Sequence, residues 1–247
     1  MFGLIGYPLE HSFSSAYFTG KFREEGIEAV YRNFPLEDIS EFAILISNEP
    51  DLAGLNVTVP YKEKVVPHLD ALGVTARTIR AVNTICVCRR GKGKALIGHN
   101  TDIAGFRQSL EEHLGPRHDA ALVLGTGGSS RAVCHVLKEL GIPFSQVSRS
   151  RGEGVLGYEE LDGQIVRKHL LIINTTPLGM HPDVDSFPDI PYEAVTPGHL
   201  LFDLVYNPAK TRFLAKGEEQ GAATINGYDM LVYQAEASWK IWNRQEE

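Results

Sequence analysis

The chain has 247 residues, of which 43% are hydrophobic and 22% are charged, and its formal net charge is −7. This is the composition of a globular protein long enough for one large domain or two smaller ones, each with its own core. The acidic balance argues against nucleic acid as the main partner, because phosphate binding needs clustered positive charge. The one basic run, at residues 89–94, contains two glycines between strand-like segments and predicts a solvated hairpin tip.

The cysteines and the lack of a long apolar segment indicate a cytoplasmic protein. Cys86, Cys88 and Cys134 are odd in number and lack the spacing of a disulfide framework. No second Cys or His pair stands near them at metal-ligand spacing, so we expect no metal site. No apolar run reaches the roughly 18 residues that a membrane span needs, and the N-terminus reads as a strand rather than a signal peptide.

The first hundred residues predict strands that alternate with helices, followed by a hairpin. Apolar positions recur in successive short segments with the period of a strand or of a helix. The predicted elements are a strand at residues 2–6, a helix at 15–25, a strand at 30–34, a helix at 39–47, a strand from residue 54, a helix at 74–79 and paired strands at 82–90 and 94–100. This order predicts an N-terminal α/β lobe.

The strand that begins at residue 54, in the sequence GLNVTVPYKEKV, has one apolar face and one polar face. Leucine and valines occupy alternate positions, and Asn56 and Thr58 occupy the positions between them. Pro60 should end this strand, because proline cannot donate a ladder hydrogen bond. Lys62 is then expected at the rim of the lobe, beside the polar face.

The rest of the chain predicts a parallel, doubly wound sheet, because short, wholly apolar strands alternate with helices. The predicted elements are a helix at residues 101–115, a strand at 120–125, a helix that ends before residue 141, strands at 144–148, 169–174 and 199–206, and a final helix at 227–242. We expect residues 1–100 with 225–247 to form one domain and residues 101–224 to form a Rossmann-like domain. The last helix would return to the first lobe and leave a cleft between the two.

A glycine-rich loop follows the strand at residues 120–125 and opens the next helix. Gly125, Gly127 and Gly128 would permit a tight turn and a close approach of backbone N–H groups to a pyrophosphate. The third position of the G-x-G-x-x-G pattern holds Ser130, so the pattern is incomplete. The loop predicts dinucleotide binding, with an ordinary strand-to-helix turn as the alternative.

The end of the next strand, SRSR at residues 148–151, carries two arginines where an NAD site usually carries a carboxylate. Arginine offers a fork of donors to phosphate oxygens, and no carboxylate stands there to repel a 2′-phosphate. The stretch predicts NADP rather than NAD, and a solvated loop is the alternative.

Three further stretches place small hydrogen-bonding residues at predicted strand ends or loops, as the polar face beside Lys62 does. These stretches are EHSFSS, AVNTI and GHNTDIAGF. One of them alone would be an Asx turn or a helix cap, but four in one lobe predict a pocket for a small hydroxylated or carboxylated ligand. Lys62 and Asp102 would be its ionisable pair, because a carboxylate orients a lysine and tunes its pKa for acid–base work. The alternative is a surface lysine and an aspartate that caps a helix.

Motifs along nearly the whole chain resemble those of the shikimate dehydrogenase family, and they occur in the family's order. The matching stretches are GYPLEHSFS, NVTVPYK, AVNT, NTDIAGF, LGTGGSSRA, INTTPLGM, DLVYNPAKT and DMLVYQA. A single match of this kind would be weak, whereas the ordered set is highly specific.

The resemblance implies an NADP-dependent oxidoreductase that acts on a CH–OH group and reversibly reduces 3-dehydroshikimate to shikimate in aromatic amino-acid and chorismate biosynthesis. It implies that Lys62 and Asp102 are the catalytic pair. The substrate would be held by Ser12, Ser14, Asn56, Thr58, Asn83, Tyr206 and Gln234. NADP would be held by Gly125, Gly127, Gly128, Ser148, Arg149, Arg151, Gly227 and Met230.

The chain also departs from the family's pattern. Ser15 stands where proline is usual, and Ser148 stands where asparagine usually precedes the phosphate-binding arginine. Residues 151–161 form a shorter segment than the helix usual in the family, which leaves the strength of the preference for NADP open. A quinate or aminoshikimate dehydrogenase, or a non-catalytic NADP or shikimate sensor, are the alternatives, and a monomer and a homodimer are both compatible with the sequence.

Overall fold

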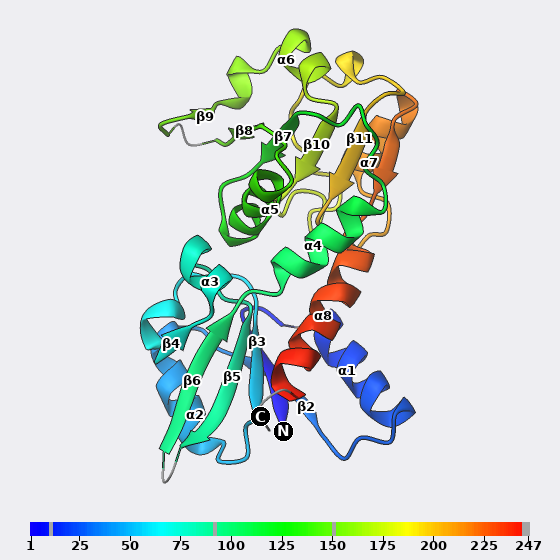
Figure 1. Cartoon of the computed structure of the whole chain (residues 1–247). Helices are drawn as coiled ribbons and strands as arrows, with labels where there is room; N and C mark the ends of the chain where they lie inside the picture. Colours follow the sequence, from blue (N-terminus) through cyan, green and yellow to red (C-terminus); the bar gives the residue numbers. More distant parts are fainter. Residues whose placement is uncertain (10–11, 91–92, 150–151, 244–247) are drawn as a thin grey trace. The chain divides into compact units, whose positions relative to one another are not determined.

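The computed structural model describes residues 1–9, 12–90, 93–149 and 152–243. Backbone contacts divide the chain into two compact units (Figure 1). The first unit comprises Met1–Asp102 and Gln234–Glu247, and the second comprises Ile103–Tyr233. Each unit is built on a six-stranded sheet of its own. Among the described helices, none is both long and apolar enough to cross a membrane.

The sheet of the first unit is mixed and has the strand order β2-β1-β3-β5-β6-β4. Its β1 is parallel to β2 and β3, whereas β3, β5 and β6 are successively antiparallel. The elements of this unit are β1 (Phe2–Gly6), α1 (Phe13–Glu24), β2 (Tyr31–Pro35), η1 (Ile39–Glu41), α2 (Phe42–Asn48), β3 (Gly54–Val57), η2 (Val66–His68), β4 (Ala71–Leu72), α3 (Val74–Ile79), β5 (Thr84–Arg90) and β6 (Gly93–His99). The tip of the predicted β5–β6 hairpin lies outside the described residues.

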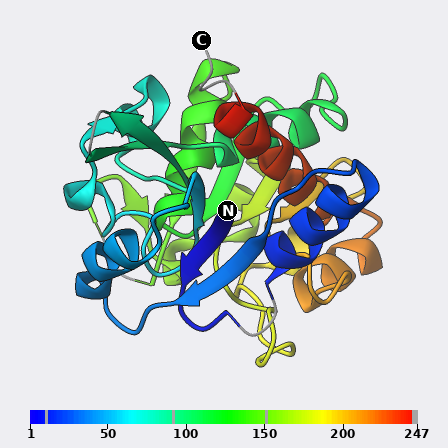
Figure 2. The same ribbon diagram turned by 90° about the horizontal axis from the view of Figure 1, so that it is seen from below.

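Helices cover both faces of this first sheet. Helix α1 and the C-terminal part of α8 (Tyr228–Asn243) lie side by side on one face, and α2 lies on the other (Figure 2). The α1–α8 face is packed with aromatic rings: Phe18 stacks on Tyr31 with ring centroids 4.8 Å apart, and Trp242 stacks on Phe2 at 4.8 Å. The expected return of the last helix to the first lobe is therefore found from Gln234 onward.

Gly54 is required where β3 meets the last helix. A methyl group on Gly54 would collide with the indole of Trp242, whose Nε1–H donates to the backbone carbonyl of Ile85 at 3.0 Å. Strand β3 itself ends at Val57 rather than at the proline, although Thr58 still donates its backbone N–H to β1.

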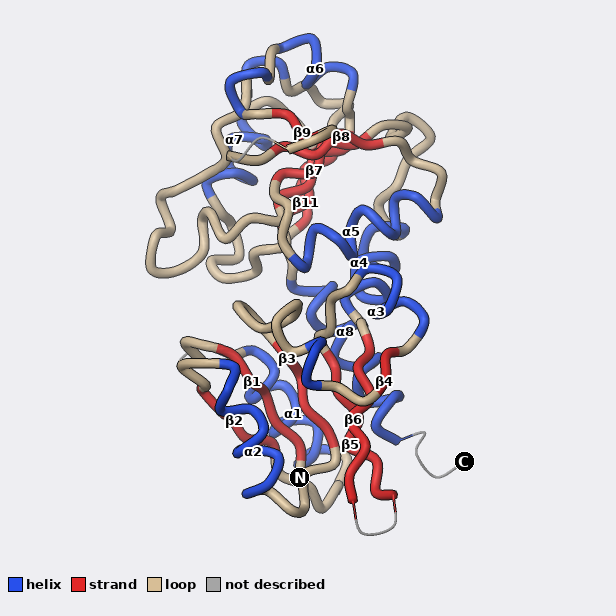
Figure 3. Tube along the Cα trace, turned by 90° about the vertical axis from the view of Figure 1, so that its left-hand side faces the viewer, coloured by secondary structure: helices blue, strands red, loops and turns tan. Residues whose placement is uncertain are grey.

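The second unit contains a parallel sheet in the order β12-β11-β10-β7-β8-β9. Its elements are α4 (Asp102–Glu111), β7 (Ala121–Leu124), α5 (Gly128–Glu139), β8 (Phe144–Val147), β9 (Val155–Leu156), η3 (Tyr158–Glu160), α6 (Gly163–Lys168), β10 (Leu171–Asn174), η4 (Tyr192–Ala194), β11 (Leu200–Asp203), α7 (Arg212–Glu219) and β12 (Ala223–Ile225), followed by the start of α8. Strands β7, β8, β9 and β11 of this sheet are labelled in Figure 3. Counted within this unit, the strands have the order of the Rossmann fold. The predicted doubly wound parallel sheet is thus confirmed.

Helices cover both faces of the second sheet, so the side chains that alternate between the two faces of each strand are buried on both. Leu122, Ile172 and Leu201 pack with the buried residues of α6 and α7. On the opposite face, Phe202 makes an edge contact with Phe106 of α4 at 5.2 Å between ring centroids. Strands covered on both sides explain the wholly apolar runs in the sequence.

Candidate functional site

A buried lysine–aspartate pair lies in the first unit. Lys62 Nζ is 2.7 Å from Asp102 Oδ2, and the two side chains are only 16% and 6% exposed. Forty residues separate them in the sequence, so spacing alone could not show that they meet. An ion pair this well shielded from water is screened less than a surface pair.

Hydrogen bonds hold both Lys62 and the residue before it in place. The buried phenol of Tyr61 donates to the carbonyl of Leu36 at 2.6 Å, and the backbone N–H of Val82 donates to the carbonyl of Lys62 at 2.7 Å. Asp102 is the first residue of α4, where a carboxylate is favoured by the positive end of the helix dipole. The Lys62 and Asp102 side chains therefore both extend from backbone that is held in place.

The amide of Asn83 holds the other oxygen of Asp102. Its Oδ1 accepts the backbone N–H of Thr101 at 2.7 Å, which fixes which end of the amide is the acceptor. Its Nδ2 consequently faces Asp102 Oδ1 at 2.8 Å and Gln234 Oε1 at 3.2 Å. Asp102 is thus bonded through one oxygen to Lys62 and through the other to Asn83.

Asn56 belongs to the same buried network, but its hydrogen bonds reach Asn83 and Ser238 rather than Lys62 or Asp102. It accepts a hydrogen bond from the phenol of Tyr31 at 2.8 Å and donates to the backbone carbonyl of Asn83 at 3.2 Å and to Ser238 Oγ at 3.0 Å. The side chain is only 3% exposed, so the polar face predicted for β3 points into the protein.

The remaining substrate-binding candidates of the first unit lie at its strand ends and on α1. Ser12 is the N-cap of α1 and accepts the backbone N–H of Ser15 at 3.3 Å. Burial raises the pKa of Tyr31, and a hydrogen bond with Ser14 opposes that rise. Thr58 is half-buried directly after β3. Tyr206 belongs instead to the second unit, half-buried after β11.

The glycine loop follows β7 at the switch point of the second sheet, where the strand order reverses between β7 and β10. Gly125 has φ of +112°, and a methyl group on it would come within 2.6 Å of Thr175 Oγ1 at the end of β10. A methyl group on Gly127 would meet no atom within 4 Å, so backbone is openly presented there. Gly127 is also the N-cap of α5 and has no side-chain cap bond, which suits a phosphate at the helix N-terminus.

Ser130 explains how this chain manages without the third glycine of the pattern. The side chain is only 1% exposed, and its hydroxyl donates to the carbonyl of Gly125 at 2.8 Å. Gln146 of β8 in turn donates to Ser130 Oγ at 3.0 Å. The serine therefore braces the loop from inside, and the residues present fit a dinucleotide.

The candidates for the 2′-phosphate follow β8. Ser148 is half-buried and donates its backbone N–H to Leu156, whereas Arg149 is exposed. Burial raises the pKa of the Tyr158 phenol, and the neighbouring Arg149 guanidinium opposes that rise. Arg151 lies outside the described residues.

The two candidates near the nicotinamide lie at the start of α8. Gly227 abuts the chain after β11 so closely that a methyl group would collide with the carbonyl of Leu204, and its N–H donates to Val205 at 3.1 Å. Met230 is 6% exposed one turn further along the helix.

Tyr31 and Ser238 were missed as site residues, and Thr84 entered the predicted pocket only as part of the AVNTI stretch. Thr84 follows Asn83 in the AVNTI stretch, and Ser238 lies four residues after Gln234 on the stripe of the last helix, so the motif and the helical period were the available signals. All three are buried and bonded to the residues that surround Asp102 or to Asn56.

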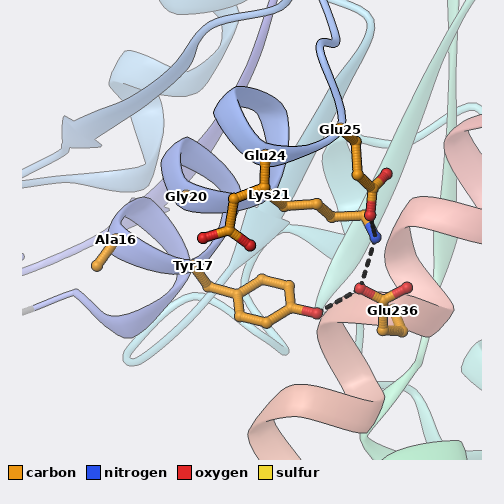
Figure 4. A pocket seen from close by; sticks show the side chains of 7 residues that line it. All are labelled: Ala16, Tyr17, Gly20, Lys21, Glu24, Glu25 and Glu236. Carbon is orange, nitrogen blue, oxygen red and sulfur yellow. Dashed lines mark hydrogen bonds and ion pairs between the residues drawn. The ribbon is translucent and has the colours of Figure 1, made fainter.

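A surface hollow elsewhere in the first unit is occupied by ion pairs. Lys21 Nζ lies 2.7 Å from Glu25 and 2.9 Å from Glu236, and the Tyr17 phenol donates to Glu236 (Figure 4). None of the residues lining it belongs to the network around Asp102. Within the described ranges, no three His, Cys, Asp or Glu side chains gather as a metal site would require.

Together, these features define a class of protein. A parallel sheet in Rossmann order with a glycine loop at its switch point is the dinucleotide-binding half of many dehydrogenases. The separate α/β unit carries a lysine–aspartate pair, and both side chains are of types that can act in general acid–base chemistry.

Within that class, the chain belongs to the shikimate dehydrogenase family. The family pattern described as "Shikimate dehydrogenase substrate binding domain" matches residues 4–85. The NADP-dependent shikimate dehydrogenase of Desulforamulus reducens is 36% identical over 97% of this chain and 88% of its own length.

Solved structures of similar proteins support the same family. The shikimate dehydrogenase of Thermus thermophilus, solved with NADP(H) and shikimate, is 30% identical with a TM-score of 0.85, over 98% of this chain and 92% of its own. The quinate dehydrogenase of Corynebacterium glutamicum, solved with NAD, is 26% identical with a TM-score of 0.84, again over 98% of this chain and 92% of its own.

Proposed function

We propose that this chain catalyses the NADP-dependent, reversible reduction of 3-dehydroshikimate to shikimate. The observation that carries the proposal is the contact of Lys62 with Asp102, in a unit whose residues 4–85 match a shikimate dehydrogenase substrate-binding domain. The first unit would bind and position the substrate, and the second would bind NADP.

In the proposed reaction, a side chain of this protein exchanges the proton with the substrate, and the cofactor exchanges the hydride. When bound, NADPH would supply the hydride that reduces the carbonyl carbon of 3-dehydroshikimate. The Lys62 ammonium donates a proton to the carbonyl oxygen as it becomes an alkoxide, and in the reverse direction Lys62 accepts that proton. Asp102 restricts the Lys62 ammonium to one position, because the carboxylate is itself held by Asn83.

The substrate's carboxylate and hydroxyls would meet the polar groups around this pair. We assign them to Ser12, Ser14, Asn56, Thr58, Asn83, Gln234 and, from the second unit, Tyr206. Asn56 already donates and accepts hydrogen bonds within the protein, so a direct substrate contact would require it to exchange one of them.

The second unit would hold NADP at the switch point of its sheet. The pyrophosphate would be bound by Gly125, Gly127 and Gly128, the 2′-phosphate by Ser148, Arg149 and Arg151, and the nicotinamide would lie near Gly227 and Met230. The open backbone at Gly127 and the uncapped start of α5 support this arrangement.

An initial-rate comparison tests the proposal. We expect turnover of shikimate with NADP, slower turnover with NAD, and little turnover of quinate with either. A preference for quinate would support the alternative that the likeness to the quinate dehydrogenase suggests. Binding without turnover of either substrate would support a sensor. A cytoplasmic location and a monomeric or homodimeric state stay predictions of the sequence.

A further inference from the structure

Three buried hydroxyl groups form a triangle beside Asn83, the residue that holds Asp102. Thr84 Oγ1 is 2.7 Å from Ser238 Oγ, Thr101 Oγ1 is 3.1 Å from Ser238 Oγ, and the two threonine oxygens are 3.2 Å apart. Their exposures are 0%, 2% and 0% for Thr84, Thr101 and Ser238. The triangle joins β5, the residue before α4, and helix α8 of the first unit.

The hydrogen bonds of Ser238 can be assigned from its fixed partners. Its hydroxyl donates to the backbone carbonyl of Gln234 at 2.9 Å. Asn56 must present its Nδ2 to Ser238, because the same Nδ2 donates to the backbone carbonyl of Asn83. With its own proton used, the Ser238 oxygen accepts hydrogen bonds from Asn56 and from Thr84.

This assignment determines which hydrogen-bond donors reach the side-chain oxygen of Asn83. When Thr84 donates to Ser238, the hydroxyl of Thr101 can donate to Asn83 Oδ1 at 3.2 Å, beside the backbone N–H of Thr101, and this acceptor is nearer than Gln234 Oε1 at 3.4 Å. Asn83 Oδ1 then has two donors from one residue, which fixes the amide plane with Nδ2 directed at Asp102.

We propose that Ser238 is a positioning residue that, through this hydroxyl triangle, sets the orientation of Asn83 and so of the Asp102 carboxylate that meets Lys62. The inference rests on the proposed function. Ser238 touches neither Lys62 nor Asp102 in the structure's hydrogen-bond network, and acts by keeping Thr84 from donating to Asn83.

Removing the serine hydroxyl should perturb orientation more than folding. In Ser238→Ala, Thr84 loses its 2.7 Å partner but still lies 3.2 Å from Asn83 Oδ1 and from Thr101, so its hydroxyl keeps a partner. The freed Thr84 proton then competes for Asn83 Oδ1, which pulls the amide away from the geometry that serves Asp102.

The test compares Ser238→Ala with Ser109→Ala as a matched control. Ser109 is also a buried helix serine, 1% exposed, and within the described part of the chain its hydroxyl has no hydrogen-bond partner. For shikimate oxidation with NADP, we expect Ser238→Ala to lower kcat about tenfold with KM changed less than about twofold, and Ser109→Ala to match the wild type. Thr84→Val removes the hydroxyl that would compete for Asn83 Oδ1, so adding Ser238→Ala to Thr84→Val should change kcat by less than about twofold.

A double-mutant cycle separates positioning from a merely structural effect. If Ser238 acts through Asn83, adding Ser238→Ala to Asn83→Ala should lower kcat by less than about twofold further. An additive effect, a loss confined to KM, or equal rates in Ser238→Ala and Ser109→Ala would overturn the inference.

A crystal structure of the Ser238→Ala variant tests the positioning role without an activity measurement. We expect the Asn83 amide to rotate and its Nδ2 to leave hydrogen-bonding distance of Asp102 Oδ1. An unchanged Asn83–Asp102 contact would refute the positioning role even if the wild type proved inactive on shikimate, an outcome that would refute only the proposed function.

Discussion

Asp203 should make the stability of the protein depend on pH in a direction opposite to that of an ordinary aspartate. The carboxyl group lies at the end of β11 with no exposed surface, and burial raises its pKa from 3.8 to about 6. Hydrogen bonds from Thr211 Oγ1 at 2.6 Å, Asn174 Nδ2 at 2.9 Å and the N–H of Val205 at 3.0 Å limit the rise.

The sign follows from proton binding. Between pH 3.8 and about 6, the folded protein holds the Asp203 proton more tightly than the unfolded chain does, so this group's contribution to stability falls as pH rises. The contribution is complete below pH 3.8 and is lost as pH rises through about 6. The difference between the two pKa values corresponds to about 3 kcal/mol in the free energy of unfolding.

Asp203→Asn removes this titration and keeps an amide of the same shape. Its oxygen can still accept from Asn174 and Val205, and any cost of the altered Thr211 contact does not depend on pH. Urea unfolding followed by circular dichroism should show that the variant gains about 2 kcal/mol relative to the wild type between pH 4 and pH 7. The control is Asp185→Asn, because that side chain is 78% exposed in the same unit and should show no such change.

A constant difference between Asp203→Asn and the wild type across this pH range would refute the reasoning. So would a variant that loses stability relative to the wild type as pH rises, since that would mean the buried carboxylate is stabilised by its three donors more than it is destabilised by burial.

Other expected results concern the cofactor loop, the 2′-phosphate and the aromatic packing. Arg149→Ala should raise KM for NADP about tenfold and KM for NAD less than about twofold, and equal effects on both would remove the 2′-phosphate assignment. Gly125→Ala should lower stability by about 1–3 kcal/mol, because of its φ of +112° and the contact with Thr175, whereas Gly127→Ala should be nearly neutral in thermal denaturation. Gly54→Ala should destabilise the first unit by about 1–3 kcal/mol, and tryptophan fluorescence that unfolds at the wild-type urea midpoint would contradict the packing against Trp242.

Strong local patterns made much of the fold predictable from the sequence. The apolar runs of β7, β10 and β11 indicated strands covered on both faces, and the structure contains them in one parallel sheet. Strands β4 and β9 were not predicted because each has only two residues, too few for a period to appear. The predicted helix at residues 101–115 ends at Glu111, since its last turn becomes irregular before the glycine.

The candidate site was less predictable, because its contacts join distant parts of the chain. Asn83 and Gln234 are 151 residues apart, and nothing in their spacing indicates that they share a hydrogen bond. The order of the family motifs supplied that grouping instead. Ser238 escaped notice because a buried serine on a helical stripe looks like a packing residue until its partners are known.

The central claim is that Lys62 transfers the substrate proton, and turnover of Lys62→Ala tests it most directly. The matched control is Lys64→Ala, an exposed lysine two residues away in the same turn. We predict that Lys62→Ala lowers kcat for shikimate oxidation with NADP at least about a hundredfold, while shikimate still binds and Lys64→Ala keeps the wild-type rate. Wild-type turnover in Lys62→Ala would contradict the account.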